Sequence, residues 1–297
     1  MKNILITGGS GLVGRALTQE LETANYSVAW LSRTPEKQSQ KSFDWDIDKK
    51  TIDDQALDWA DAIIHLAGAN VSEKRWTSSR KKIILESRTS SAQLIFDHLR
   101  TREKKPEVIV SASGANYYGS DNGEKWINEE SPAGKDFLAE VVVKWEKTVH
   151  QFKNLGIRTA CLRTGIVLAK DGGALPQMLQ PPIAAPLGTG NQYMSWIHLE
   201  DLVRMFVFAL EHNNISGSYN AVAPQPVTNR EMTKKAAKYS GKPFINIPVP
   251  GFVLKLILGE MAGIVLGGNK INGDKIISGG FRFHFSEINH ALKDIYK

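Results

Sequence analysis

The N-terminal stretch MKNILITGGSGLVG constrains the fold of this chain more than any other segment. Its apolar run ILI predicts a buried parallel strand over Lys2–Thr7. A glycine-rich turn follows directly, and a helical pattern then runs from Arg15 to Thr23. The order strand, glycine turn, helix is typical of the first unit of a nucleotide-binding α/β sheet.

The spacing of the glycines predicts that this turn binds a dinucleotide. Gly9, Gly11 and Gly14 fit G-x-G-x-x-G, and Gly8, Gly11 and Gly14 fit the related G-x-x-G-x-x-G. Glycine permits the tight turn, the approach of a pyrophosphate to the backbone, and close packing of the helix on the strand. The N–H groups at the helix N-terminus then face the phosphates. We expect these residues to contact the dinucleotide: Gly8, Gly11, Leu12, Val13 and Gly14.

The end of the second predicted strand, Ser27–Leu31, indicates which dinucleotide is bound. An NAD enzyme normally carries Asp or Glu there, to hold the ribose 2′-hydroxyl. This chain has Ser32, Arg33 and Thr34 instead, and a guanidinium suits a 2′-phosphate. We therefore expect NADP(H) rather than NAD as the cofactor, with Ser32 and Arg33 as contacts.

Two further strands complete the predicted cofactor site. A third strand, Phe43–Ile47, brings Asp46 to the border of the adenine pocket. A fourth, Asp61–Ala69, ends in small residues where a backbone must pass close to the cofactor. The contacts expected from its end are Leu66, Ala67 and Gly68. His65, inside this apolar strand, is interpreted as a core histidine satisfied by its neighbours.

Alternating strands and helices continue to residue 223. Strands are predicted over Glu107–Ala112, Ile157–Ile166, Tyr193–Ile197 and Tyr219–Val222, and helices over Ser72–Arg102, Lys135–Phe152 and Leu202–Glu211, the last capped or begun by Asp201. The fold class is therefore α/β: a Rossmann-type doubly wound parallel sheet with a smaller C-terminal substrate lobe. We assign residues 1–170 and 195–223 to the Rossmann domain, and residues 171–194 and 224–297 to the lobe.

The lobe carries helical patterns but no readable catalytic motif. Thr228–Ser240 opens with a capping box, and a terminal helix is expected over Ser286–Tyr296. Phe252–Leu266 is apolar, but Lys255 and Glu260 interrupt it and it is too short to span a bilayer. We interpret it as a helix packed inside the lobe.

Composition narrows the class of protein. The net charge of +6 comes from Lys and Arg scattered among Asp and Glu, which argues against a nucleic-acid surface. The single cysteine, Cys161, lies in an apolar strand and allows no disulfide within the chain. No metal-binding motif is present. With no signal-peptide pattern at the N-terminus, a cytoplasmic protein is expected, as monomer or homodimer.

Several stretches together resemble the short-chain dehydrogenase/reductase superfamily in its extended, epimerase-like form. They are GGSGLVG, HLAGA, SASGANYYG, LRTGIVL and WIHLEDL, in that order. The stretches RWT, YYG, FLAEVVVKWE and GFRFHF are similar to a branch described as epimerase family proteins, of unclear substrate. The resemblance covers practically the whole chain.

The resemblance implies a reaction that uses a Ser or Thr together with Tyr and Lys spaced as Y-x-x-x-K. In that pattern the tyrosine exchanges a proton with the substrate oxygen, and the lysine lowers the tyrosine pKa and holds the ribose. This chain has Phe137 and Val141 at those two positions, and neither can move a proton. The serine corresponds to Ser113, with Ser111 as the weaker candidate.

The remaining candidates come from two loops. Tyr117 and Tyr118 are the nearest phenols that could take the proton, or could only pack the pocket wall. Arg75 and Trp76 follow the fourth strand and are candidates for the substrate pocket. We expect an NADP-dependent oxidoreductase or epimerase for a small polar, sugar-like substrate. The alternative is a cofactor-binding protein that has lost catalysis and reports the NADP(H) state to a partner.

Overall fold

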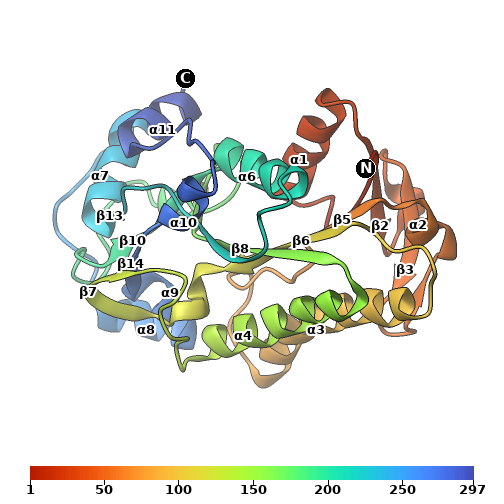
Figure 1. Ribbon diagram of the computed structural model, residues 1–297. Helices are drawn as coiled ribbons and strands as arrows, with labels where there is room; N and C mark the ends of the chain where they lie inside the picture. Colours follow the sequence, from red (N-terminus) through yellow and green to blue (C-terminus); the bar gives the residue numbers. More distant parts are fainter.

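The computed structural model describes residues 1–297, and a central eight-stranded sheet runs through it (Figure 1). Its strands are β1 (Asn3–Thr7), β2 (Ser27–Ser32), β3 (Ser42–Asp46), β4 (Thr51–Ile52), β5 (Ala62–His65), β6 (Val108–Gly114), β8 (Arg158–Thr164) and β12 (Gly217–Ala221). The order across the sheet is β12-β8-β6-β5-β1-β2-β3-β4. All pairs are parallel except β3–β4 at one edge. The order reverses at β1, which confirms the doubly wound Rossmann-type sheet.

Helices cover both faces of the sheet, which is why its central strands are continuous apolar runs. On one face lie α1 (Leu12–Thr23) and α6 (Leu199–Glu211), and on the other α2 (Asp54–Trp59), α3 (Ser78–Arg100) and α4 (Phe137–His150), as Figure 1 shows. Ile4 and Ile6 of β1 pack with α1 and α6, whereas Leu5 between them packs with α2 and α3. Alternate side chains of one strand therefore enter the two main clusters of the core.

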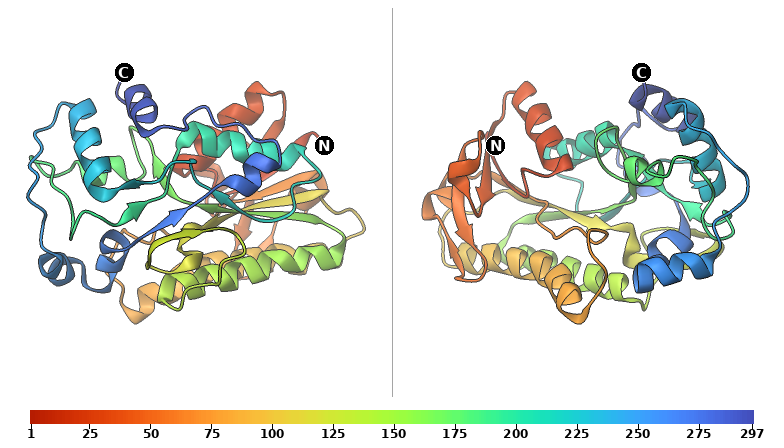
Figure 2. Two further views of the ribbon diagram at one scale, coloured as in Figure 1. Left: turned by 60° about the vertical axis from the view of Figure 1, so that its left-hand side comes forward. Right: turned by 180° about the vertical axis from the view of Figure 1, so that it is seen from behind.

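A smaller C-terminal lobe lies at one end of the sheet (Figure 2). Its helices and strands are α5 (Leu175–Met178), β10 (Tyr193–Met194), β13 (Val227–Thr228), α7 (Asn229–Ser240), α8 (Gly251–Leu258), η4 (Gly259–Met261), α9 (Ala262–Leu266) and α11 (Ile288–Ile295). Buried side chains of α5, α7 and α11 share a third apolar cluster. The helix expected over Phe252–Leu266 is broken at Gly259. No helix of the chain has both the length and the apolar character that crossing a membrane requires.

Two further strand pairs lie outside the central sheet, and the first of them joins the sheet domain to the lobe. The strand β7 (Asp121–Ile127) pairs with β14 (Gly268–Ile271), and β9 (Ile166–Leu168) pairs with β11 (Trp196–His198). The predicted strand Tyr193–Ile197 is in fact divided between β10 and β11. Two short 3₁₀ helices, η1 (Pro35–Lys37) and η3 (Gln151–Leu155), and α10 (Asp274–Ser278) complete the elements outside the site.

The predicted start of α6 was wrong. The helix begins at Leu199, where the His198 ring accepts a hydrogen bond from the backbone N–H of Glu200. Asp201 is instead a fully buried residue of the first turn. Its carboxylate accepts the backbone N–H groups of His284 and Phe285, so it fastens the C-terminal segment to α6.

Candidate active site

The glycine turn between β1 and α1 forms a cradle in which Gly8 and Gly14 have no room for a side chain. Gly8 has φ +72° and lies where a Cβ would be 2.9 Å from the carbonyl carbon of Leu66. A Cβ on Gly14 would lie 2.5 Å from the Gly8 carbonyl oxygen. Gly11 caps α1 without any side-chain hydrogen bond, so the first N–H groups of the helix remain free. These features fit a bound diphosphate.

A first cavity of about 680 Å³ extends from this turn along the carboxyl ends of β2 and β5. Seven of the eleven predicted contacts line this cavity: Gly8, Gly11, Ser32, Arg33, Leu66, Ala67 and Gly68. Val13 lines the next cavity, and Leu12, Gly14 and Asp46 line neither. Arg33 is exposed and makes no ion pair, so its guanidinium is free for a phosphate. Trp45 and Ile47, the neighbours of Asp46, line the wall instead.

Asp46 has a local structural role. Its Oδ1 accepts the backbone N–H groups of Asp48 and Lys49 in the turn after β3. The hydrogen bond from Lys49 is the main reason that the Asp46 pKa lies below its ordinary value. The structure therefore places the carboxylate in a turn and gives it no part of the cavity wall.

A second cavity of about 290 Å³ lies beside the first, because Leu66 and Gly68 line both. Ser113, at the end of β6, and Val141, on α4, line this second cavity. Phe137, one turn before Val141, faces the next cavity. The two positions that depart from Y-x-x-x-K thus lie on the cavity walls and carry no proton donor.

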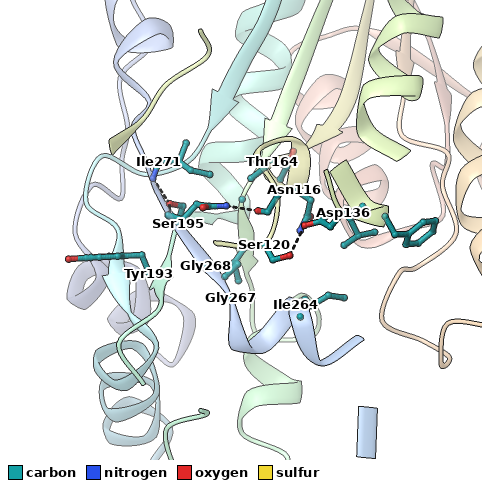
Figure 3. Close-up of a pocket in the computed structure, with 18 of the residues that line it drawn as sticks. Asn116, Ser120, Asp136, Thr164, Tyr193, Ser195, Ile264, Gly267, Gly268 and Ile271 are labelled. Carbon is teal, nitrogen blue, oxygen red and sulfur yellow. Dashed lines mark hydrogen bonds between the residues drawn. The ribbon is translucent and has the colours of Figure 1, made fainter. Parts of the chain in front are cut away.

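A third cavity, of about 300 Å³, lies between the sheet domain and the lobe (Figure 3). It shares Asn116, Leu138 and Thr164 with the second cavity, so the three cavities are neighbours in a row. The Ser120 hydroxyl donates to Asp136 over 2.5 Å, and the Asn269 amide donates to the Gly119 carbonyl over 2.6 Å. The lining residues include Asp136 and Glu260 but no lysine or arginine.

The candidates Arg75 and Trp76 have separate positions. Trp76 lines the third cavity and packs edge-on against Phe137, with ring centroids 5.0 Å apart. Arg75 lies outside the lining and donates to the Leu256 carbonyl of α8. Only Trp76 is therefore in a position to contact a ligand in this cavity.

Ser113 belongs to a buried polar network built by strand register. Ser113, Arg163 and Asn220 stand opposite one another on the adjacent strands β6, β8 and β12. The Ser113 hydroxyl donates to Glu146 Oε1 over 2.6 Å, and Arg163 donates to both oxygens of the same carboxylate at 2.8 Å. Burial opposes ionisation of Glu146, but the hydrogen bonds and charge of Arg163 outweigh it, so the Glu146 pKa is lowered. Glu146 is therefore an anion whose charge Arg163 balances.

The structure does not bring Tyr117 or Tyr118 to the cavities. Both lie on the 3₁₀ turn η2 (Ala115–Tyr118). The Tyr118 hydroxyl, 2 % exposed, donates to Asn220 Oδ1 over 2.6 Å and accepts from Arg163. Burial raises the pKa of Tyr118 to about 12. The Tyr117 ring packs under the Arg163 guanidinium, 3.4 Å from the ring centroid. The expectation that one of these phenols takes the substrate proton is not supported, since both are committed to Arg163.

His65 and Ser111 are core residues. The two imidazole nitrogens lie 3.3 Å from the Ser111 hydroxyl and 2.9 Å from the Ser91 hydroxyl, and the ring is 1 % exposed. Burial, with the charge of Arg88 adding to it, lowers the pKa of His65 to about 4. The interpretation of His65 as a satisfied core histidine is confirmed, and Ser113 rather than Ser111 faces a cavity.

Several residues of the site were missed from the sequence. Arg88, Asn116 and Thr164 line the second cavity, and Glu146 holds the Ser113 hydroxyl. A helical wheel of α4 places Glu146 on the apolar side with Val142 and Val149, and that buried carboxylate was an available signal. Nothing in the sequence singled out Asn116 or Thr164.

Comparisons with known proteins agree with this geometry. Residues 4–222 match the model of the NAD dependent epimerase/dehydratase family, and residues 249–295 match a domain of unknown function, DUF1731. The chain is 35% identical over 301 residues to the epimerase family protein SERP0438 of Staphylococcus epidermidis, covering 100% of both chains. It is 34% identical to the epimerase family protein SAR0825 of Staphylococcus aureus, covering 99% of both.

Solved structures give the same result. The crystal structure of human epimerase family protein SDR39U1 (isoform 2) with NADPH superposes with a TM-score of 0.90 at 31% identity, covering 99% of both chains. The nucleoside-diphosphate sugar epimerase of Corynebacterium glutamicum superposes with a TM-score of 0.80 at 32% identity, and this chain covers 58% of it. The protein described here belongs to the NAD-dependent epimerase/dehydratase family, as an epimerase family protein with a DUF1731 C-terminal domain.

Proposed function

We propose that this protein is an NADP(H)-binding, epimerase-like oxidoreductase that acts on a small polar, sugar-like substrate. The observation that carries the proposal is the row of three adjacent cavities. It begins at the unpaired Arg33, passes the glycine turn and Ser113, and ends in the polar cavity beside the lobe. A dinucleotide along the first two cavities would present its reactive end to a substrate in the third.

The preference for NADP(H) rests on Arg33. No carboxylate stands at the end of β2, and a free guanidinium pairs with a phosphate through two parallel hydrogen bonds. NADPH in the crystal structure of the human relative supports this choice. Ser32 is positioned beside Arg33, although its hydroxyl accepts the backbone N–H of Thr34.

The substrate class follows from the third cavity. A diphosphate or carboxylate would need a cation, and the lining provides none. The side chains of Asn116, Ser120 and Asp136 instead suit an uncharged ligand rich in hydroxyl groups. The volume of about 300 Å³ suits a ligand the size of a single sugar.

Ser113 has a defined hydrogen-bonding role in this arrangement. The nicotinamide supplies hydride transfer when bound. Because the Ser113 proton is donated to the Glu146 anion, the serine oxygen has only lone pairs to offer a ligand. It would therefore accept a hydrogen bond from a substrate hydroxyl that reaches from the third cavity into the second. With Phe137 and Val141 on the walls, proton exchange would depend on solvent in the third cavity.

The test is turnover of NADPH or NADP by purified protein against a panel of small aldoses, ketoses and polyols, beside nucleotide-diphosphate sugars. We expect turnover with a small uncharged member of the panel and none with the nucleotide sugars. Ser113→Ala should reduce it by roughly tenfold or more, with NADPH affinity unchanged within about twofold. Ser39→Ala, an exposed serine outside the cavities, is the matched control.

A second candidate function is an NADP(H)-dependent reporter protein. It is favoured by Phe137 and Val141, because the two positions that carry Tyr and Lys in the Y-x-x-x-K pattern have apolar side chains here. Cofactor binding without turnover of any panel member would support it. Turnover that Ser113→Ala removes while NADPH affinity stays intact would exclude it.

A further inference from the structure

Arg88 is a cation on α3 that has almost no partner within the chain. Its Nη1 donates to the Ile84 carbonyl over 2.9 Å, which is the only hydrogen bond that the guanidinium makes. It forms no ion pair, whereas Arg80 on the same helix pairs with Glu73. The indole of Trp145 lies beside it, with the guanidinium carbon 5.2 Å from the ring centroid.

This position is unfavourable for the free protein. Burial lowers the pKa of Arg88 to about 10, and the charge of Arg80 adds to the effect. A guanidinium carries five N–H donors, and four of them have no acceptor in the chain. A cation held in this way is stabilised by any ligand that brings oxygen acceptors to it.

The guanidinium lies at the start of the second cavity. A Cβ on Gly68 would be 3.0 Å from the Arg88 guanidinium carbon, so the two are in contact. Gly68 lines both the first and second cavities, whereas Arg88 lines the second alone. Arg88 is also the only charged residue among those that line the second cavity.

We propose that Arg88 binds the ribose that joins the diphosphate of NADP(H) to the nicotinamide. The inference rests on the proposed cofactor binding. With the 2′-phosphate at Arg33 and the diphosphate at the glycine turn, the next part of the dinucleotide to enter the second cavity is this ribose. Its vicinal hydroxyls present two acceptors side by side, which match the planar fork of a guanidinium. Arg88 is thus a cofactor-positioning residue supplied by α3.

The experiment titrates three ligands into the wild type and into Arg88→Met by calorimetry. NADPH contains the second ribose, 2′-phospho-ADP ends at the diphosphate, and 2′,5′-ADP ends at the first phosphate. Arg88→Met should weaken the affinity for NADPH roughly tenfold or more and leave the affinities for both shorter ligands within about twofold of the wild type. Arg88→Lys, which keeps the charge and loses the fork, should weaken NADPH by less. Arg100→Met, an exposed arginine of the same helix, is the control.

The outcomes separate this inference from the proposed function. Unchanged NADPH affinity in Arg88→Met would overturn it, and so would equal weakening of 2′-phospho-ADP, which would make Arg88 a diphosphate contact. Failure of the wild type to bind NADPH would overturn the cofactor assignment itself. Thermal unfolding shows whether Arg88→Met is folded. If it is not, the three titrations are made with Arg88→Lys instead. Equal affinity of wild type and Arg88→Lys for NADPH would then count against the fork geometry.

Discussion

Replacement of Glu146 by glutamine should cost a large part of the folding free energy. The Glu146 carboxylate accepts both hydrogen bonds of the Arg163 fork and one each from Ser113 and Ser218. Glu146 and Arg163 are each 4 % exposed. In Glu146→Gln the amide directs N–H groups at Arg163 and leaves its charge unbalanced. Removal of one partner from a buried pair costs about 3–5 kcal/mol, against a total stability of about 5–15 kcal/mol for a typical protein.

Urea unfolding at pH 7 measures this cost as the change in the free energy of unfolding. Glu140→Gln, on the exposed side of the same helix, is the control and should cost below about 1 kcal/mol. The double variant Glu146→Gln/Arg163→Met should be more stable than the sum of the two single losses by about 1 kcal/mol or more, because the second change removes the unbalanced charge. The reasoning would be refuted if Glu146→Gln cost no more free energy of unfolding than Glu140→Gln. It would also be refuted if the loss in the double variant equalled the sum of the two single losses.

The remaining predictions concern pH, the phosphate cradle and Tyr118. Because the Glu146 pKa is lower in the folded chain than in the unfolded one, its stabilisation is present above the unfolded pKa of about 4.3 and is lost as the pH falls through the folded value. The stability difference between wild type and Glu146→Gln should therefore narrow in acid unfolding curves as the pH falls below the unfolded pKa, and a constant difference would contradict it. The pKa of His65 is about 4 in the folded chain and about 6.5 in the unfolded chain. The neutral ring therefore makes its full contribution to the free energy of unfolding above pH 6.5, and this contribution is lost as the pH falls toward 4. His65→Gln should flatten the stability curve in that window, and an unchanged slope would count against a buried neutral ring. Gly14→Ala should abolish NADPH binding in calorimetry, because its Cβ would lie 2.5 Å from the Gly8 oxygen; normal binding would mean that the cradle is not the phosphate site. Tyr118→Phe should lower the free energy of unfolding by about 1–3 kcal/mol, because Asn220 loses its donor, while NADPH affinity stays the same. A selective loss of NADPH affinity would contradict this role and would show that Tyr118 contacts the cofactor.

Much of the fold follows from local patterns in the sequence. The strands of the sheet are short apolar runs between helical segments, and this alternation depends only on neighbouring residues. The start of α6 was misplaced because aspartate is a residue type that commonly caps helices. The Asp201 carboxylate instead accepts hydrogen bonds from the backbone N–H groups of His284 and Phe285, which are far away in the sequence. Strands β7 and β14 were missed for a related reason, since each pairs with a strand that is far away in the sequence.

Site residues could be predicted where a single loop supplies them, and could not be predicted where their position depends on several packed elements. The glycine turn and Arg33 are local features, and the structure places both on one cavity. The orientation of Tyr118 depends on the turn η2 and on Arg163, a partner from another strand. Arg88 is one of several cations on α3, and no local pattern in the sequence distinguishes it from the others. Its position toward the cavity depends on how α3 packs against α4.

The most direct test of the central claim is a calorimetric titration of the protein with NADPH and, separately, with NADH, repeated on Arg33→Ala. The account predicts tight binding of NADPH, weaker binding of NADH, and a loss of the difference in Arg33→Ala. Loss of the two hydrogen bonds to the 2′-phosphate should weaken the affinity for NADPH by roughly tenfold to a hundredfold and leave the affinity for NADH nearly unchanged. Equal affinity of the wild type for the two dinucleotides, or no binding of either, would contradict the account.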